Sequence, residues 1–435
     1  MKTLIYSLLG LFLGFSGTAK EITKEQHAHL SVSATGIELL SIDAMNTEIT
    51  IEIWDKKEVS VDAHFYYRGE EDHSKIQEFM DSFEENVKSG ITSLGKEIKL
   101  DTYRAVPSKK KVGWESSWLN FTLVKEGFSD KEVKLVYELK VPASLYMSIK
   151  HSYQDLRVIG TVSKINIEQY SGRLSLDKVE NATLNLKYGE ASISELAKAD
   201  IYLYEQNVIG RDWGDIELNA KYSKLRVKTI NTLGGQGYET NYRAIDLQNL
   251  VGNYKYCSFD MIHVKAMNLT CYETQVESNS VDRLDLANSK YSNYHIDKLD
   301  QVNITESYED EYSFQDVKNL SSSSSKYCKF NIETLTGNYS LLNAYECRVN
   351  MDAISGPSGT IKIDGKYLNI SLGLADLKYK LQSSFQYGNL QYPNSLQGNF
   401  NQQNSRTTAS LKTPNLGKSF YIVELSGYEL EANLK

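Results

Sequence analysis

The chain has 435 residues, of which 41% are hydrophobic and 24% charged, so a folded protein is expected and wholesale disorder is excluded. The 48 basic and 56 acidic side chains give a formal net charge of −8, which provides no general basic surface for nucleic acid. The length exceeds that of one ordinary compact domain and suits two domains or a repeat array.

Residues 1–19 have the pattern of a signal peptide. Lys2 precedes an apolar stretch at 4–15, which has the length of a signal-peptide core and is too short to span a bilayer. Gly17 and Ala19 are the small residues that cleavage after Ala19 requires. The alternative interpretation is an apolar N-terminal strand. We expect an exported protein, in the periplasm, on the outer surface or secreted, whose mature chain has no transmembrane segment.

Residues 20–142 are predicted to form a β-rich capping domain. An alternating apolar pattern at 49–61 around a Trp54-Asp55 turn predicts a hairpin. One amphipathic stripe predicts a helix near 74–89, and the basic run at 109–111 is expected in an exposed loop. This region is expected to cover the first strands of a repeat, because an open solenoid end exposes unpaired strand edges.

A Lys-Tyr signal recurs through the middle of the chain. Its tyrosines are Tyr188, Tyr222, Tyr256, Tyr291 and Tyr327, at successive intervals of 34, 34, 35 and 36. Another tyrosine falls midway in each gap, so that from Tyr153 to Tyr387 a tyrosine recurs at a period of about 18 residues. A fixed period indicates a solenoid, and this one is too short for the two-helix units of ankyrin or tetratricopeptide repeats.

The apolar pattern within each unit predicts short strands. Apolar residues recur 3, 5, 8, 11, 13 and 15 positions after the tyrosine, for example from Phe259 to Cys271 after Tyr256. A step of two is typical of a strand, and a step of three turns a corner. Because parallel crossovers are right-handed, we expect an all-β fold, a right-handed parallel β-helix over residues 143–392. One inner column is predicted at Ile193, Val227, Met261, Ile296 and Ile332.

Two further features concern the ends and interior of this array. Residues 143–356 contain no proline, which fits interior strands that donate their N–H groups to the next rung. The serine run at 321–325 is in register with a strand, so we expect some of its serines inside. Residues 393–435 are expected to end the array as a loop and closing strands.

Several residues resemble a known family. The motif Ile51-x-Ile53-Trp54-Asp55-Lys56-x-Glu58-Val59-x-Val61, a helix, and Val141-Pro142 leading into Tyr-Gly-type rungs resemble the bacterial putative adhesin family. These are secreted or envelope β-helix domains related to the autotransporter-adhesin head type. The resemblance implies a binding role and supplies no catalytic residues. Lys-Tyr-Ser and Lys-Tyr-Cys replace the usual Tyr-Gly in several rungs here.

The candidate site residues are tyrosines and cysteines. The column of Tyr188, Tyr222, Tyr256, Tyr291 and Tyr327 is interpreted mainly as a structural stack and otherwise as a platform for sugars or another polymer. Cys328 and Cys347 occupy equivalent places in successive rungs, which makes them candidates for a disulfide.

No catalytic residue, cofactor or metal site is predicted. His27-Ala28-His29 is a metal-binding pattern, but no cysteine or carboxylate cluster in the sequence completes it, and we interpret it as a mobile segment. No Gly-x-Ser-x-Gly elbow, phosphate loop or His-Glu-x-x-His motif is present.

The expected function is that of a non-enzymatic exported solenoid, an adhesin or surface-binding protein whose partner is an unidentified protein or glycan of the envelope or cell surface. One alternative is a periplasmic envelope sensor or scaffold, in which the array is a spacer and the N-terminal part holds the partner. A second alternative is a carbohydrate-active β-helix enzyme, which needs acid and base groups in one groove.

Overall fold

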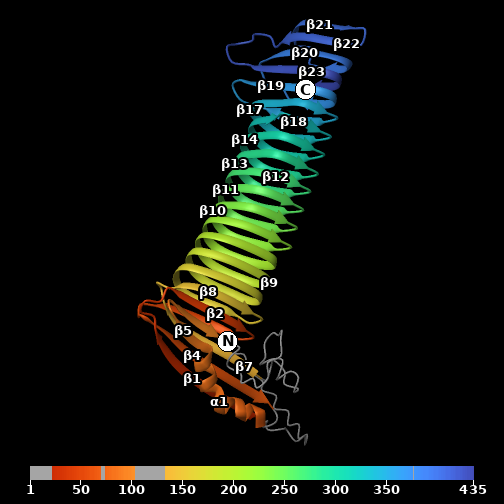
Figure 1. The fold of residues 1–435 in the computed structure, drawn as a ribbon. Coiled ribbons are helices and arrows are strands. Elements are labelled where there is room, and N and C mark those ends of the chain that lie inside the picture. Colours follow the sequence, from red (N-terminus) through yellow and green to blue (C-terminus); the bar gives the residue numbers. More distant parts are fainter. Residues whose placement is uncertain (1–21, 70–73, 103–132, 376) are drawn as a thin grey trace, which may run out of the picture.

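The protein is a long stack of strands with a broader N-terminal end (Figure 1). The computed structural model describes residues 22–69, 74–102, 133–375 and 377–435. The expected signal peptide and the loop expected at 109–111 lie outside these residues. The described part is all-β apart from one helix, and no helix in it is long and apolar enough to cross a membrane.

The described residues of the N-terminal part form eight strands and this helix. They are β1 Ile22–Ser33, β2 Leu39–Met45, β3 Glu48–Trp54, β4 Glu58–Gly69, α1 Ser74–Gly90, β5 Ile91–Leu94, β6 Glu97–Asp101, β7 Val133–Pro142 and β8 Tyr146–Ser152. The helix expected near 74–89 is therefore present. Its Phe79 and Phe83 rings lie 4.6 and 6.1 Å from the ring of Phe65 on β4, so its apolar face packs on the sheet.

The hairpin predicted at 49–61 is wrong, because another strand separates its two arms. Leu139 of β7 pairs with Ile51 of β3 in parallel and with Val61 of β4 in antiparallel. Both arms alternate as a hairpin would, but alternation fixes which side chains are buried and not which strand lies alongside. The partner of both arms is β7, which lies far downstream in the sequence, beyond α1, β5 and β6.

The N-terminal strands continue directly into the array. Ile42 of β2 pairs in parallel with Ile149 of β8, and Ile51 of β3 pairs in parallel with Val158 of β9. The backbone edges at the start of the array are therefore occupied, which removes a site for pairing with other chains.

The array itself consists of strands that pair in parallel with those of the next rung. They are β9 Leu156–Lys221, β10 Lys224–Tyr238, β11 Asn241–Lys255, β12 Ser258–Tyr272, β13 Gln275–Lys290, β14 Asn293–Tyr308, β15 Glu311–Ser322, β16 Ser325–Lys326, β17 Lys329–Tyr345, β18 Arg348–Ile354 and β19 Gly359–Leu372. Paired residues are 17 or 18 positions apart in β10 to β14, which accounts for the period seen in the sequence.

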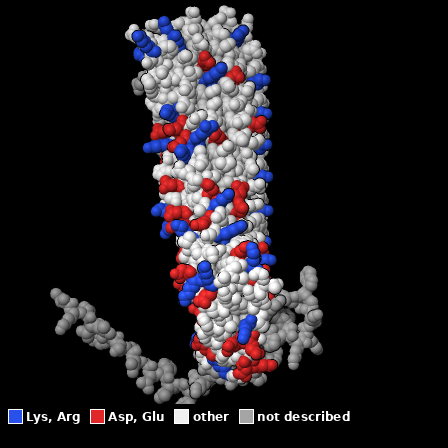
Figure 2. All heavy atoms as spheres, turned by 60° about the vertical axis from the view of Figure 1, so that its left-hand side comes forward, with Lys and Arg blue, Asp and Glu red and all other residues white. Residues whose placement is uncertain are grey.

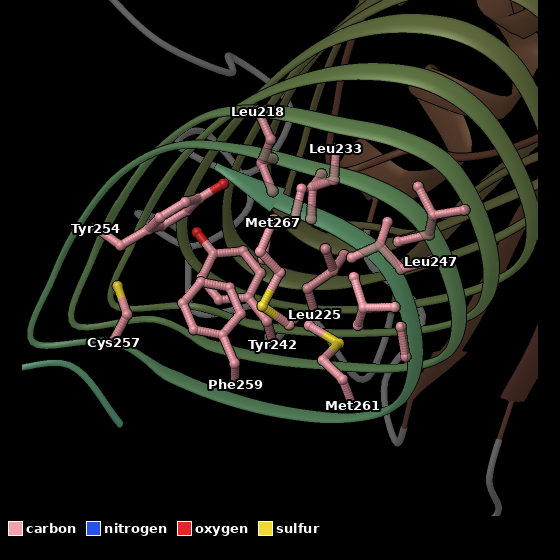
Figure 3. Packing of buried hydrophobic residues seen from close by; sticks show 14 of the residues in the cluster. Leu218, Leu225, Leu233, Tyr242, Leu247, Tyr254, Cys257, Phe259, Met261 and Met267 are labelled. Atoms are coloured by element: carbon pink, nitrogen blue, oxygen red, sulfur yellow. The ribbon is translucent and has the colours of Figure 1, made fainter. Parts of the chain in front are cut away.

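The core lies inside the coil (Figure 3). The five residues predicted as one inner column are at most 2% exposed. A second inner column is aromatic: Tyr242 stacks on Phe259 with centroids 4.7 Å apart, and Tyr294 stacks on Tyr312 at 5.1 Å. The serine run also points inward in part, since Ser322 and Ser325 are buried with their Oγ atoms 2.7 Å apart.

The C-terminal end differs from the expected order. Here the strands are β20 Tyr379–Gln391, β21 Gln397–Gln403, β22 Arg406–Lys412 and β23 Tyr421–Leu434. Strand β23 pairs in parallel with both β19 and β20, so the last strand lies between two earlier ones. The end of the array is covered by β22 and β21: β22 pairs in antiparallel with β20, and β21 pairs in antiparallel with β22.

Candidate functional site: a tyrosine ladder

One line of tyrosine side chains follows the array from one end to the other. We call this set the tyrosine ladder; in spatial order it is Tyr153, Tyr170, Tyr188, Tyr204, Tyr222, Tyr238, Tyr256, Tyr272, Tyr291, Tyr308, Tyr327, Tyr345, Tyr367, Tyr428 and Tyr387. Neighbouring ring centroids lie 5.0–5.8 Å apart with interplanar angles of 60–80°. These are edge-to-face contacts, a geometry that aromatic pairs prefer. At about 4.8 Å per rung the ladder is about 67 Å long.

Two kinds of corner alternate beneath the ladder. In one the sequence is Lys-Tyr and the tyrosine has positive φ, as at Tyr256 (56°); in the other it is Tyr-Glu and the glutamate has positive φ, as at Glu273 (46°). Lys255 pairs with Tyr238 on one side and Tyr272 on the other, so lysine and tyrosine alternate in one column. The rings therefore zigzag between two adjacent columns.

The charged members of these corners form two further rows. The ladder lysines are Lys187, Lys221, Lys255, Lys290, Lys326 and Lys366; the ladder glutamates are Glu205, Glu239, Glu273, Glu309, Glu346 and Glu429. Sequence reasoning found the lysines and tyrosines but missed the glutamates. The signal that identifies them is the Tyr-Glu dipeptide midway between successive Lys-Tyr dipeptides.

The ladder is open to solvent. The five tyrosines singled out from the sequence are 40–45% exposed, and the structure brings all five into the same ladder. Their hydroxyl-bearing rings present an amphipathic surface, apolar across the ring and polar at the tip. A carboxylate lies beside the intervening rings: a hydrogen bond to Glu239 raises the pKa of Tyr238, and one to Glu273 raises that of Tyr272.

Buried polar side chains hold the corners from inside. Ser292 Oγ accepts a hydrogen bond from the Thr274 amide at 3.1 Å, and Asp310 Oδ1 accepts one from the Ser292 amide at 2.8 Å. The Tyr312 hydroxyl donates to the other oxygen of Asp310 at 3.2 Å. Burial raises the pKa of Asp310 to about 6, more than these hydrogen bonds lower it.

Cys328 and Cys347, the two candidates for a disulfide, are both buried in successive rungs, and both are free cysteines in the structure. Cys328 Sγ lies 2.8 Å from Ser307 Oγ, and Cys347 Sγ donates to the Ser325 carbonyl at 3.3 Å. The thiols therefore satisfy their hydrogen bonds within the core. The neighbouring Cys347 thiol and burial raise the pKa of Cys328.

The histidines at the N-terminus belong to a strand, so their interpretation as a mobile segment is wrong. His27 and His29 lie on β1, where their ring nitrogens are 3.4 and 2.6 Å from Asp62 Oδ1 on β4. The His64 ring lies 4.6 Å from that of His27. Within the described ranges, no group of three or more histidine, cysteine, aspartate or glutamate residues is arranged to hold a metal ion.

A hollow of about 740 Å³ adjoins the C-terminal end of the ladder. Its lining includes the ladder rings Tyr345 and Tyr428 together with Lys326, Lys366 and Arg406. Over the array as a whole the charges are mixed: Figure 2 shows acidic and basic side chains intermingled on one face, with basic side chains recurring along its right-hand edge. The hollow thus combines aromatic and cationic groups at one end of a long aromatic line.

Comparison with known protein families and with curated proteins finds no match to this chain. Two solved structures are similar to it. A "putative cell adhesion protein" from Clostridium sporogenes is 10% identical, with 95% of this chain and 100% of the other covered and a TM-score of 0.17. A "putative lipid binding protein" from Parabacteroides distasonis is 11% identical, with 78% and 96% covered and a TM-score of 0.18. Scores this low support no argument about the fold or function of this chain.

Proposed function

We propose that the chain is an exported, non-enzymatic surface-binding protein of the cell envelope, adhesin-like in its role, and that it binds its partner along the tyrosine ladder. The observation that carries the proposal is the ladder itself, in which an amphipathic tyrosine ring lies on every rung and a solvent-exposed one recurs along the whole array. Contacts that are weak singly gain avidity when many engage one extended partner. Export rests on the signal-peptide pattern of residues 1–19.

We infer as part of this proposal that the coil is a right-handed parallel β-helix. The parallel register between successive rungs supports it, because parallel strands joined by a crossover are right-handed in almost all proteins. An experimental structure with a left-handed coil would contradict the inference.

The experiment that tests binding replaces open ladder rings and measures retention by envelope fractions. Tyr222, Tyr256 and Tyr291 are changed together to asparagine, which tolerates the positive φ of these positions. We expect the variant to lose at least tenfold in binding to isolated envelopes. The matched control changes Ile245 and Ile262, exposed residues outside the ladder, to asparagine and should bind as the parent does.

Unchanged binding by a folded triple variant would refute the role of the ladder. Fractionation of the cells of origin tests export, since recovery from the cytosol of a protein that still carries its signal-peptide segment would contradict it. Incubation with a panel of polysaccharides tests the non-enzymatic part, because steady turnover of any glycan would show an enzyme.

A further inference from the structure

The tyrosine ladder has a chemical repeat of two rungs rather than one. Successive corners alternate between Lys-Tyr and Tyr-Glu, and their register places Lys255 beside Tyr272 and Tyr272 beside Lys290. A partner that meets the same groups again must therefore advance by two rungs. At about 4.8 Å per rung, this repeat is about 9.6 Å.

The exposure of the rings follows the same two-rung repeat. The tyrosines at positive φ are the open ones, at 40–50% exposure: Tyr153, Tyr188, Tyr222, Tyr256, Tyr291, Tyr327, Tyr367 and Tyr387. The rings between them are less exposed, from Tyr204 to Tyr428. Tyr170 departs from this pattern at 43% exposure, and there Ser171 replaces the glutamate of the other Tyr-Glu corners. From Tyr188 onward, each full repeat thus offers one open ring.

The two charged rows do not neutralise each other, and each ladder glutamate that accepts a hydrogen bond from its neighbouring tyrosine, such as Glu239 or Glu273, keeps a second carboxylate oxygen as an acceptor. Within the described part of the chain, no ion pair joins a ladder lysine to a ladder glutamate. The Lys187 ammonium instead lies 5.7 Å from the ring of Tyr202, on the strand before the corner. Each two-rung repeat therefore presents an open phenol ring, an ammonium group and a carboxylate in fixed order.

We propose that the partner of the ladder is a linear β-linked glycan whose disaccharide unit aligns with two rungs. The proposal rests on the proposed function and names the partner class of the same site. A disaccharide unit in an extended β-linked chain has nearly the length of the two-rung repeat. One sugar of each unit packs its apolar C–H face on an open ring, and hydroxyl groups donate to the carboxylate.

The alignment predicts how affinity depends on chain length. Each added disaccharide reaches one more open ring, whereas a single added sugar ends over a less exposed one. We expect affinity to rise at least threefold with each added pair of sugars and to change less with each odd one. The eight open rings at positive φ, Tyr153 to Tyr387, set the length at which the increase stops.

The experiment titrates the full mature protein with β-1,4-linked oligosaccharides of two to eight sugars by calorimetry. One series is N-acetylglucosamine and the other mannuronate, so a stronger mannuronate series identifies the lysine row as a carboxylate-binding element. Changing Tyr222, Tyr256 and Tyr291 to asparagine should weaken binding of the eight-sugar chain at least tenfold. The Ile245→Asn, Ile262→Asn double variant should bind as the parent does.

Three results would overturn the inference: no binding in either series, an affinity independent of chain length, or equal binding by the ladder variant. The envelope assay separates this failure from failure of the proposed function. If envelopes bind the parent but not the ladder variant, and digestion of the envelopes with proteinase K abolishes binding of the parent, the partner is a protein and only the glycan inference fails. A concentration-dependent dimer that the ladder variant does not form would assign the ladder to a second copy and would also refute the glycan.

Discussion

Asp310 is a carboxyl group at a corner where neighbouring rungs have serine, threonine or cysteine. It is 1% exposed, and burial raises its pKa to about 6 from an ordinary value of 3.8. The folded protein therefore binds a proton between these pH values that the unfolded chain does not. The contribution of the Asp310 carboxyl group to the free energy of unfolding is full below about pH 4 and is lost as pH rises through 6. The change is about 3 kcal/mol.

Replacing Asp310 with asparagine should remove this pH dependence. The amide oxygen still accepts a hydrogen bond from the Ser292 amide, and it has no proton to lose. Urea unfolding of parent and variant between pH 4 and pH 7 measures the difference. The parent should weaken relative to the variant as pH rises; parallel stability curves would contradict the assignment of the buried carboxyl.

The two kinds of ladder tyrosine should respond differently to substitution. Tyr272→Asn removes two edge-to-face contacts worth about 0.5–1.5 kcal/mol each. Tyr256→Asn also removes two such contacts, but it replaces a bulky residue at positive φ. That conformation costs a bulky residue about 1–2 kcal/mol, which the substitution recovers in part. The thermal midpoint should therefore fall further for Tyr272→Asn. The reverse order would show that positive φ is not strained at these corners.

At the level of elements, the strands within the array could be predicted from the sequence. The strands that pair with one another at the two ends of the array could not. The column from Ile193 to Ile332 followed from the spacing of apolar residues, because inward positions in a strand alternate. Nothing local distinguishes β7 as the neighbour of both β3 and β4, since pairing between distant strands leaves no periodic signal. The ladder glutamates could have been found, because Tyr-Glu recurs as regularly as Lys-Tyr.

Loss of strand β23 should destabilise the C-terminal end of the array and leave the rest of the array folded. This strand is the parallel partner of β19 and of β20, so ending the chain before Tyr421 leaves both without that pairing. We expect limited proteolysis of the shortened protein to cut within residues 359–412 and to spare β10 to β14. Repeat stability depends on adjacent rungs, which confines the damage. Cleavage throughout the array would show instead that the whole stack folds as one cooperative unit.

For the whole molecule, the N-terminal part should be needed to prevent strand pairing between copies of the chain at the first rungs. Removing residues 22–142 exposes the edges of β8 and β9 that β2 and β3 now occupy. Unpaired edges are templates for pairing with another chain, so we expect the shortened protein to form oligomers. Size-exclusion chromatography measures this result. A shortened protein that has the same oligomeric state as the parent and keeps its β-sheet spectrum would contradict it.

The position of β23 also fixes an order of events in time. A chain that emerges from its N-terminus can add rungs one after another through β19, but β20 cannot take its final place until residues 421–434 have arrived to lie between them. The place between β19 and β20 must stay open while the chain is synthesised, and β23 fills it last. A chain that ends before β23 would leave the edges of β19 and β20 unpaired and open to proteases. Resistance to proteolysis at this end therefore depends on whether the chain includes its last strand.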